Sequence, residues 1–444
     1  METGGQNALT LNHPCEPVLL LSPELTFQSL VHEPGLWWSL DGPLQARDAG
    51  RHLALQACLS EVARPKPEHD SFAMHAPLEL MARVRMATTG GMRDLAEGPS
   101  HERLARLQAV ATALAYRDQG PASGAASLGL RGSESLQVMG QAIESGDVQQ
   151  AQSAAMDVAA SLSASAVVHA LAPDWSRRLA CGAHAHVFLS HLVQLHACGA
   201  EWPQRALQAL PIYAGELARH PTHSLPDAGV SGPVAGAHAL RESLLATEAL
   251  PGAASGSIQR IVQQAMDAGV LQGLAPCLPA AAALSDDSLW QACMAAVCEV
   301  ALRSMLEDQP AKAKYGWTHT LTLPLALWHL AQAGALGRGE ALQVAALQVA
   351  AFRAVIGSGP MPQATPNPHH QGPCPEVDET FKGLFAQACT RPDAHLVKYV
   401  LACRDLGHMA PSLQGLGCQA AKHLTAIWVQ EQPDAGLVSG LSLR

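Results

Sequence analysis

The sequence predicts an almost wholly α-helical protein, for three reasons. Ala, Leu and Gln, which favour helices, dominate the chain. Aromatic residues, which together with β-branched residues favour strands, make up only 4% of it. Apolar residues recur at helical spacing rather than alternating as they do in strands. The chain has 444 residues, 48% of them hydrophobic, and this is enough for one large domain with a sizeable core.

Helical periodicity defines ten segments, and Gly and Pro mark the loops between them. The predicted helices cover residues 136–160, 179–197, 204–219, 258–268, 289–306, 321–333, 340–355, 379–388, 394–406 and 413–430. The loops predicted in this way are 221–236, 251–256 and 357–376. The last loop is long and contains His369 and His370, so we expect a lid or a binding loop there. We divide the chain into an N-terminal extension with partial helix, residues 1–60, and a helical domain, residues 61–444.

Charge and composition exclude several classes of partner. The net charge is −10 with no basic cluster, which argues against nucleic acid and against an anionic membrane surface. No uninterrupted apolar stretch reaches the length of a membrane span, and the N-terminus has no signal-peptide pattern, so we expect a cytoplasmic protein. Eleven scattered cysteines without a C-x-x-C pair predict reduced thiols. Only 15% of the residues are charged, which favours apolar subunit contacts and a homodimer.

Nucleotide-binding and hydrolase motifs are absent from the sequence. It contains no G-x-x-x-x-G-K-[ST], no H-E-x-x-H, no G-x-S-x-G and no EF-hand loop. Histidine is the residue type that stands out, with 21 in the chain. Most histidines on helices are surface residues or core residues with a hydrogen-bond partner, but four segments look different.

The first two segments surround His75 and His184. His75 lies two residues before Pro77, which suits the first turn of a helix, so His75 is expected at a helix entrance. The segment 182–196 carries several histidines. At 100° per residue His184 and His191 share one stripe of the helix, whereas His186 points elsewhere.

The other two segments surround His319 and His395. His319 stands among apolar and Thr residues at the start of a helix, so its imidazole needs a partner if it is buried. His395 and Lys398 are three residues apart and share a helix face, with Asp393 as the expected N-cap. The helix beyond Lys398 is apolar, and a half-buried lysine is costly unless it is paired, neutralised or modified. Spacing alone leaves two interpretations open: a metal site, or unrelated histidines that satisfy polar groups between helices.

These segments together resemble the questin oxidase-like family, whose known members are fungal enzymes of aromatic polyketide tailoring. His75-Ala-Pro-Leu resembles that family's His-(Gly/Leu)-Pro-Met segment, and Gly182-Ala-His184 resembles its Gly-x-x-His helix with a second histidine seven residues on. Trp317-Thr-His319-Thr-Leu-Thr-Leu-Pro is similar to its aromatic-x-His-x-(Val/Leu)-Thr-x-Pro pattern. His395-Leu-Val-Lys398, followed by Ala402-Cys403, is similar to its His-x-x-Lys helix.

The resemblance implies an all-α fold with an internal cavity and a mononuclear non-haem iron. The family's ligands are four histidines and a lysine carboxylated on its side-chain nitrogen. Carried over to this chain, the implied ligands are His75, His184, His319, His395 and Lys398, with His191 as the alternate to His184. His186 is a third histidine on that helix. A carbamate formed on Lys398 from CO₂ would supply the negative charge that four neutral imidazoles lack.

The function implied by the resemblance is that of an O₂-dependent oxygenase or dioxygenase acting on an aromatic, quinone-like small molecule. Ring cleavage or a Baeyer–Villiger-type insertion would be the outcome, with Lys398 and His395 at the reacting centre. Trp317, Met74 and the loop histidines are candidates for the pocket wall and lid, although Trp317 and Met74 also suit the core. Two alternatives remain: a hydrolase that uses Zn or Mn to activate water, and a non-catalytic helical protein that binds a small molecule.

Overall fold

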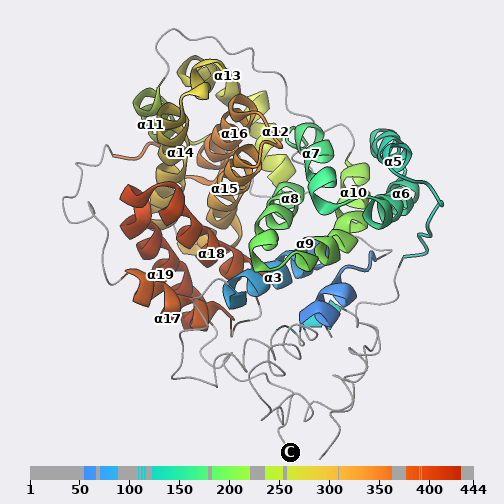
Figure 1. Ribbon diagram of the computed structural model, residues 1–444. Coiled ribbons are helices and arrows are strands. Elements are labelled where there is room, and N and C mark those ends of the chain that lie inside the picture. Colours follow the sequence, from blue (N-terminus) through green and yellow to red (C-terminus); the bar gives the residue numbers. More distant parts are fainter. Residues whose placement is uncertain are drawn as a thin grey trace, which may run out of the picture. The chain divides into compact units, whose positions relative to one another are not determined.

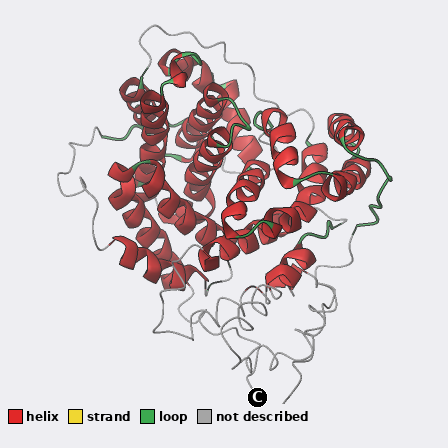
Figure 2. Cartoon of the chain, viewed as in Figure 1, coloured by secondary structure: helices red, strands yellow, loops and turns green. Residues whose placement is uncertain are grey.

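Every regular element in the described part of the chain is a helix, and no β-strand occurs there (Figure 2). The computed structural model describes residues 55–66, 71–88, 123–178, 183–220, 236–253, 258–362 and 377–431 apart from positions 309, 390 and 392, together with 109, 112, 113, 115 and 116. Tertiary contacts divide the chain into residues 1–57 and residues 58–444. The elements below all belong to the second unit, and the expected all-α fold is confirmed.

The described part of the chain contains sixteen labelled α-helices, which can be followed in Figure 1. They are α3 (Ser71–Thr88), α5 (Ser133–Ser145), α6 (Val148–Ser161), α7 (Ala164–Trp175), α8 (His184–Leu195), α9 (Glu201–Ala206), α10 (Leu210–Arg219), α11 (Ala237–Leu245), α12 (Ile258–Asp267), α13 (Val270–Leu274), α14 (Asp287–Glu307), α15 (Thr318–Gln332), α16 (Arg338–Ile356), α17 (Val377–Cys389), α18 (Ala394–Met409) and α19 (Gln414–Glu431). A single turn of π-helix, η7 (Ala313–Trp317), leads into α15.

One predicted helix, residues 136–160, is two helices in the structure. Helix α5 ends at Gly146, whose φ of 76° is the left-handed conformation that closes many helices. Asp147 then begins α6 by accepting a hydrogen bond from the backbone of Gln150. Both helices bury residues at helical spacing, so the apolar pattern of the sequence continues across the break, and periodicity alone did not reveal it. The predicted helix 204–219 is likewise divided into α9, a 3₁₀ turn and α10.

Four helices, α3, α8, α15 and α18, form a closed ring in which each packs against two others of the set (Figure 1). Helix α3 contacts α8, α8 contacts α15, α15 contacts α18, and α18 contacts α3. We call this set the four-helix ring. The remaining helices surround it: α14 and α16 pack against α15, α17 and α19 against α18, and α7 and α9 against α8. The ring therefore lies at the centre of this unit.

Helix α3 begins earlier than expected. Its first residue is Ser71, so Pro77 lies inside the helix rather than in its first turn. A proline there removes one backbone hydrogen bond and usually costs about 3 kcal/mol. The helix is held by tertiary contacts instead, since Tyr213 of α10 donates a hydrogen bond to the carbonyl of Met74 at 3.0 Å. Tyr213 in turn stacks on Phe188 of α8, with ring centroids 4.4 Å apart.

Helices α14 and α16 are long and apolar enough to cross a membrane, with a mean hydropathy of 1.3 in each case. Neither helix is an uninterrupted apolar stretch, since α14 contains Glu299 and Arg303 and α16 contains Arg353. Most of each apolar window is nevertheless buried inside the protein, 67% for α14 and 83% for α16. Core helices pass the same test of length and composition, so burial explains their hydropathy.

Candidate metal centre

Each helix of the four-helix ring contributes one histidine close to its N-terminal end. His184 is the first residue of α8, His319 and His395 are the second residues of α15 and α18, and His75 is the fifth residue of α3. Backbone N–H groups at a helix N-terminus carry partial positive charge, which disfavours protonation of an imidazole next to them. The N-terminal parts of four helices thus meet at four imidazoles.

The four imidazoles converge on one point. One ring nitrogen from each of the four lies within 4.8 Å of the others. Nε2 of His75 is 3.0 Å from Nε2 of His184 and 3.0 Å from Nε2 of His395. The ring of His319 is 5.6 Å from that of His184 and 5.1 Å from that of His395, centroid to centroid. No other group of three or more His, Cys, Asp or Glu side chains meets this criterion among the residues that the structure describes.

The contacts of His75 Nε2 exceed what hydrogen bonding alone can satisfy. A ring nitrogen carries either one hydrogen or one in-plane lone pair, so it takes part in one strong hydrogen bond. His75 Nε2 faces two other ring nitrogens at hydrogen-bonding distance, and only one of these two contacts can be a good hydrogen bond. A cation that accepts the lone pairs of all the rings would satisfy every contact. The donor set therefore fits a metal ion that prefers imidazole, such as Fe, Zn, Cu or Ni.

For two of these histidines, His395 and His319, residues just before the helix lie next to the imidazole ring. Nδ1 of His395 is 3.6 Å from Oδ1 of Asp393, the N-cap of α18. Nδ1 of His319 lies 3.5 Å from Oγ1 of Thr318, and the backbone of Gly316 and Tyr315 in the π-helix η7 raises the pKa of His319 against the larger effect of burial. Metal-binding histidines usually bond a carboxylate or a carbonyl through the second nitrogen, which fixes the ring orientation and tautomer.

Burial keeps these histidines neutral. It lowers the pKa values of His184, His319 and His395 well below 6.5, and the charge of nearby Lys398 lowers them further. His184 and His319 are at most 7% exposed. Neutral imidazole is the form that binds metals, so the cluster is ready to bind at neutral pH without releasing protons from these rings.

Lys398 is buried more completely than the sequence predicted. It is 5% exposed and lies one turn beyond His395 on α18. Burial lowers its pKa from 10.5 to about 8, while Asp393 and Glu79 act in the opposite direction. Asp393 is the N-cap that the sequence predicted, and its side chain accepts hydrogen bonds from the backbone of His395 and Leu396 at 2.8 and 3.0 Å. A substantial fraction of neutral amine is therefore present at pH 7 to 8.

Of the three histidines on α8, only His184 belongs to the cluster. His186 points away and bonds the backbone carbonyl of Ser176 at 3.1 Å. His191 is two turns beyond His184 and lines a cavity together with Lys398, in agreement with the predicted common stripe. The structure thus brings together His75, His184, His319 and His395, with Lys398 beside them, and leaves the alternate His191 outside the group.

The residues predicted to form the pocket wall and the lid are placed differently by the structure. Trp317 is fully buried and Met74 nearly so, and neither lines the cavity at Lys398, which matches the core interpretation. His369 and His370 lie outside the described residues. Sequence analysis missed Tyr315, whose exposed ring packs edge-on against His395 with centroids 5.2 Å apart. No motif marks Tyr315, because the π-helix that presents it is recognised only in three dimensions.

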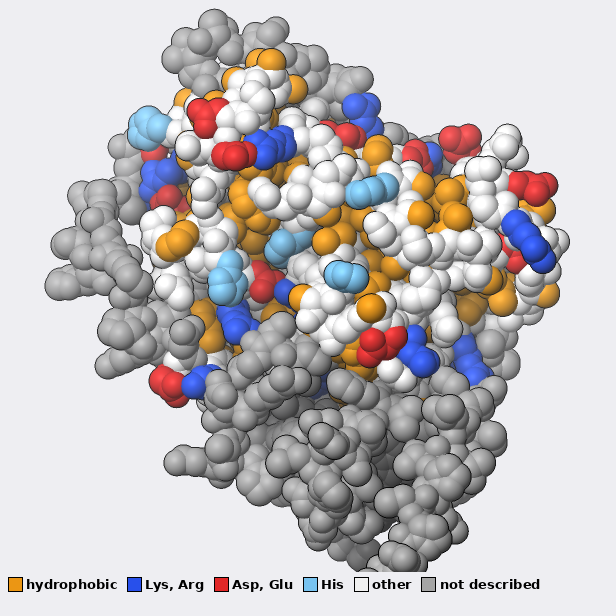
Figure 3. Space-filling view, viewed as in Figure 1, with side chains coloured by type: hydrophobic (Ala, Val, Ile, Leu, Met, Phe, Trp, Pro, Cys, Tyr) orange, Lys and Arg blue, Asp and Glu red, His pale blue; other side chains and the backbone are white. Residues whose placement is uncertain are grey.

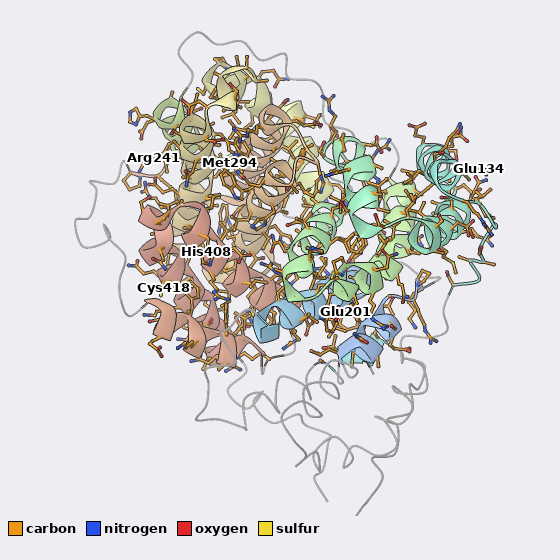
Figure 4. All side chains as sticks on the ribbon, in the orientation of Figure 1. Glu134, Glu201, Arg241, Met294, His408 and Cys418 are labelled. Carbon is orange, nitrogen blue, oxygen red and sulfur yellow. The ribbon has the colours of Figure 1, made fainter. Side chains whose placement is uncertain are left out.

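The remaining described histidines are dispersed. Figure 3 shows histidines scattered over the visible face among sparse charged groups. His408, labelled in Figure 4, is exposed at the opposite end of α18 from His395. Seven cysteines of the described part carry free thiols, as expected.

Comparison with known proteins adds no assignment: no family model, curated protein or solved structure matches the chain.

Asp393 should be replaceable by Asn but not by Ala. Asn caps helices about as well as Asp, whereas Ala leaves two backbone N–H groups of α18 without an acceptor. We expect Asp393→Ala to lower the free energy of unfolding by about 1 kcal/mol and Asp393→Asn to change it by only a few tenths. Urea denaturation followed by circular dichroism measures both. Equal losses in the two variants would contradict the capping role.

Stability should fall as the pH drops from 7 to 4. Burial lowers the pKa values of His186 and His329 from 6.5 to about 4, so the unfolded chain takes up protons in this range that the folded chain does not. The stabilisation is therefore present above pH 6.5 and is lost toward pH 4, by about 3 kcal/mol for each histidine. Denaturation curves at successive pH values measure the slope. His329→Gln should reduce this slope, while substitution of the exposed His169 should leave it unchanged; a flat profile in the wild type would contradict the expectation.

Proposed function

We propose that this protein holds one transition-metal ion through His75, His184, His319, His395 and Lys398, and that it is an O₂-dependent oxygenase acting on an aromatic, quinone-like small molecule. The observation that carries the metal site is the position of His75 Nε2, 3.0 Å from both His184 Nε2 and His395 Nε2. The motif resemblance to questin oxidase-like enzymes supports the choice of reaction.

The donor set guides the choice of metal. Imidazole nitrogen suits Fe, Zn, Cu and Ni, and a carbamate oxygen from Lys398 would add a hard ligand. Iron is our first choice of metal, with Zn or Mn as the alternatives.

A carbamate on Lys398 would complete the site. In this step the neutral amine attacks CO₂, an N–C bond forms as one C=O bond electron pair moves to oxygen, and one proton leaves the nitrogen, so that a neutral amine becomes a carbamate anion. Burial favours the first part of the step, because it penalises the ammonium form and so supplies neutral amine. Four neutral imidazoles and one carbamate would leave the ion with a net positive charge and with room for a further ligand.

When bound, an iron ion would supply the redox chemistry by which O₂ reacts at a carbon next to a carbonyl. The chain's own residues set the conditions around it. The surrounding helices exclude bulk water from His184, His319 and Lys398, which are all nearly fully buried. Asp393 lies beside the ring of His395, and the backbone of η7 lies beside that of His319. Ring cleavage and Baeyer–Villiger-type insertion are both outcomes that this proposal includes.

Elemental analysis of protein produced in iron-replete medium tests the proposal. We expect about one iron per chain in the wild type, a loss of most of it in Lys398→Ala, and O₂ consumption with hydroxylated quinones that depends on the iron. Absence of a stoichiometric transition metal, with Lys398→Ala indistinguishable from the wild type, would reject it. Stoichiometric Zn or Mn without O₂ consumption would favour the hydrolase alternative instead. Cytoplasmic localisation and a homodimer stay predictions.

A further inference from the structure

The four clustered histidines differ in their exposure to solvent. His184 and His319 are 5% and 7% exposed, whereas His75 and His395 are only partly buried. Lys398, one turn beyond His395 on α18, is again 5% exposed. The cluster therefore has a buried side toward Lys398 and a solvent side at His75 and His395, and small molecules reach the cluster from the solvent side.

Tyr315 lies on this solvent side. It precedes His319 by four residues, about one helical turn, whereas Lys398 follows His395 by about one turn. Because α15 and α18 both begin at the cluster, Tyr315 and Lys398 lie on opposite sides of it. The rings of Tyr315 and His395 are edge-on, with centroids 5.2 Å apart and planes at 88°. Tyr315 is 62% exposed, so its ring contacts His395 on one side and faces solvent with the rest of its surface.

The backbone that presents Tyr315 is anchored by the residue before it. Lys314 is 8% exposed, pairs with Glu431 of α19 and places its ammonium 3.6 Å from the ring centroid of Trp428. The ring of Tyr315 also meets that of Trp428 edge-on, with centroids 6.4 Å apart. Exposed side chains change rotamer much faster than packed backbone segments move. Rotation of the Tyr315 side chain is therefore the smallest motion that uncovers His395.

We propose that Tyr315 controls access from solvent to the histidine cluster, so that a metal ion or a small molecule reaches the cluster by passing the Tyr315 ring at His395. In the observed position the ring covers His395, and its rotation opens the path. A cover of this kind slows passage in both directions, so Tyr315 sets the rates at which the site fills and empties and leaves its affinity unchanged. The identity of what passes rests on the proposed function, whereas the covering of His395 does not.

Acylation of the metal-free protein by diethyl pyrocarbonate tests the cover in the absence of any metal. The reagent is a small molecule that reacts with the nucleophilic nitrogen of neutral imidazole, and peptide mass spectrometry gives the rate at each histidine. In the wild type His395, whose side chain is 11% exposed, should react much more slowly than the exposed His169. Tyr315→Ala should raise the rate at His395 about fivefold, because a tyrosine ring covers a large area. Tyr315→Phe keeps the ring and should react as the wild type does.

Leu128→Ala is the matched control, since Leu128 is another large exposed side chain, at 47%, in the segment before α5. It should leave the rate at His395 unchanged. The rate at the buried His184 should stay low in every variant, which separates a local opening at His395 from a general loosening of the fold. Circular dichroism of each variant verifies folding.

Uptake and release of Fe(II), followed under anaerobic conditions with a competing chelator, test passage itself. Tyr315→Ala should accelerate uptake and release by the same factor, whereas Tyr315→Phe should change neither rate. Two results would overturn the proposal: equal acylation of His395 in the wild type and Tyr315→Ala, or weaker Fe(II) affinity in Tyr315→Ala with an unchanged rate of uptake, which is the behaviour of a residue that supports a ligand. A protein that binds no metal would refute the oxygenase, and the acylation rates alone would then decide whether Tyr315 controls access to the cluster.

Discussion

Replacing any one of His75, His184, His319 or His395 with Ala should weaken metal binding by at least about 100-fold, since removal of a residue that merely orients a ligand already costs 10- to 100-fold. The metal-free variants should nevertheless remain folded. In the metal-free protein Nε2 of His75 faces two ring nitrogens at 3.0 Å, and only one of these contacts can be a good hydrogen bond, so removing the His75 ring removes an unfavourable contact. Equilibrium dialysis against Fe(II) under anaerobic conditions, with thermal melts of the metal-free proteins, measures both quantities.

Helix α8 supplies the controls for this experiment. His186→Ala and His191→Ala remove buried histidines from the same helix but not from the cluster, so both should retain metal affinity within a few-fold of the wild type. If His191→Ala lost the metal and His184→Ala kept it, His191 would be the ligand and the cluster geometry would not be that of the metal-bound protein. Full retention of metal in all four cluster variants would exclude the site altogether.

The sequence predicted those parts of the centre that depend on a single helix. Asp393 could be recognised as an N-cap because the signal is local, and the burial of Lys398 followed from the apolar residues beyond it. The common stripe of His184 and His191 followed from the helical period alone. Such features involve residues a few positions apart, for which the backbone geometry is almost fixed once the helix forms.

The arrangement of the helices in a ring could not be predicted in the same way. His75 and His395 are 320 positions apart, as are Arg85 and Asp405, and no local pattern reports such contacts. Motif resemblance suggested that the four histidines belong together, but the spacing of residues did not. Local analysis also failed at Pro77, where tertiary contacts hold a proline inside α3, and at the break after Gly146, where the apolar period masked the local Gly and Asp capping signals.

Lys398→Met should change two properties strongly and in opposite directions: it should raise stability and remove metal binding. In the metal-free protein the lysine holds its proton less tightly when folded, with a pKa of about 8 compared with 10.5 in the unfolded chain. Below pH 8 the folded state therefore carries the full penalty of about 3 kcal/mol, and the penalty disappears as the pH rises to 10.5. Met has a similar volume and no charge, so the substitution should raise the free energy of unfolding at pH 7 by up to about 3 kcal/mol.

The same substitution should abolish stoichiometric metal binding, because it removes the residue that would, as a carbamate, supply negative charge to the four imidazoles. Urea denaturation in CO₂-free buffer between pH 7 and 10.5, with metal analysis of the same preparations, measures the two effects together. Lys422→Met, which alters an exposed lysine of α19, should change neither quantity. If Lys398 only packs in the core, Lys398→Met should be more stable and should keep its metal content. If Lys398 serves only in a structural ion pair, the variant should be less stable. If Lys398 is kept for the metal at a cost in stability, the variant should gain stability and lose the ion.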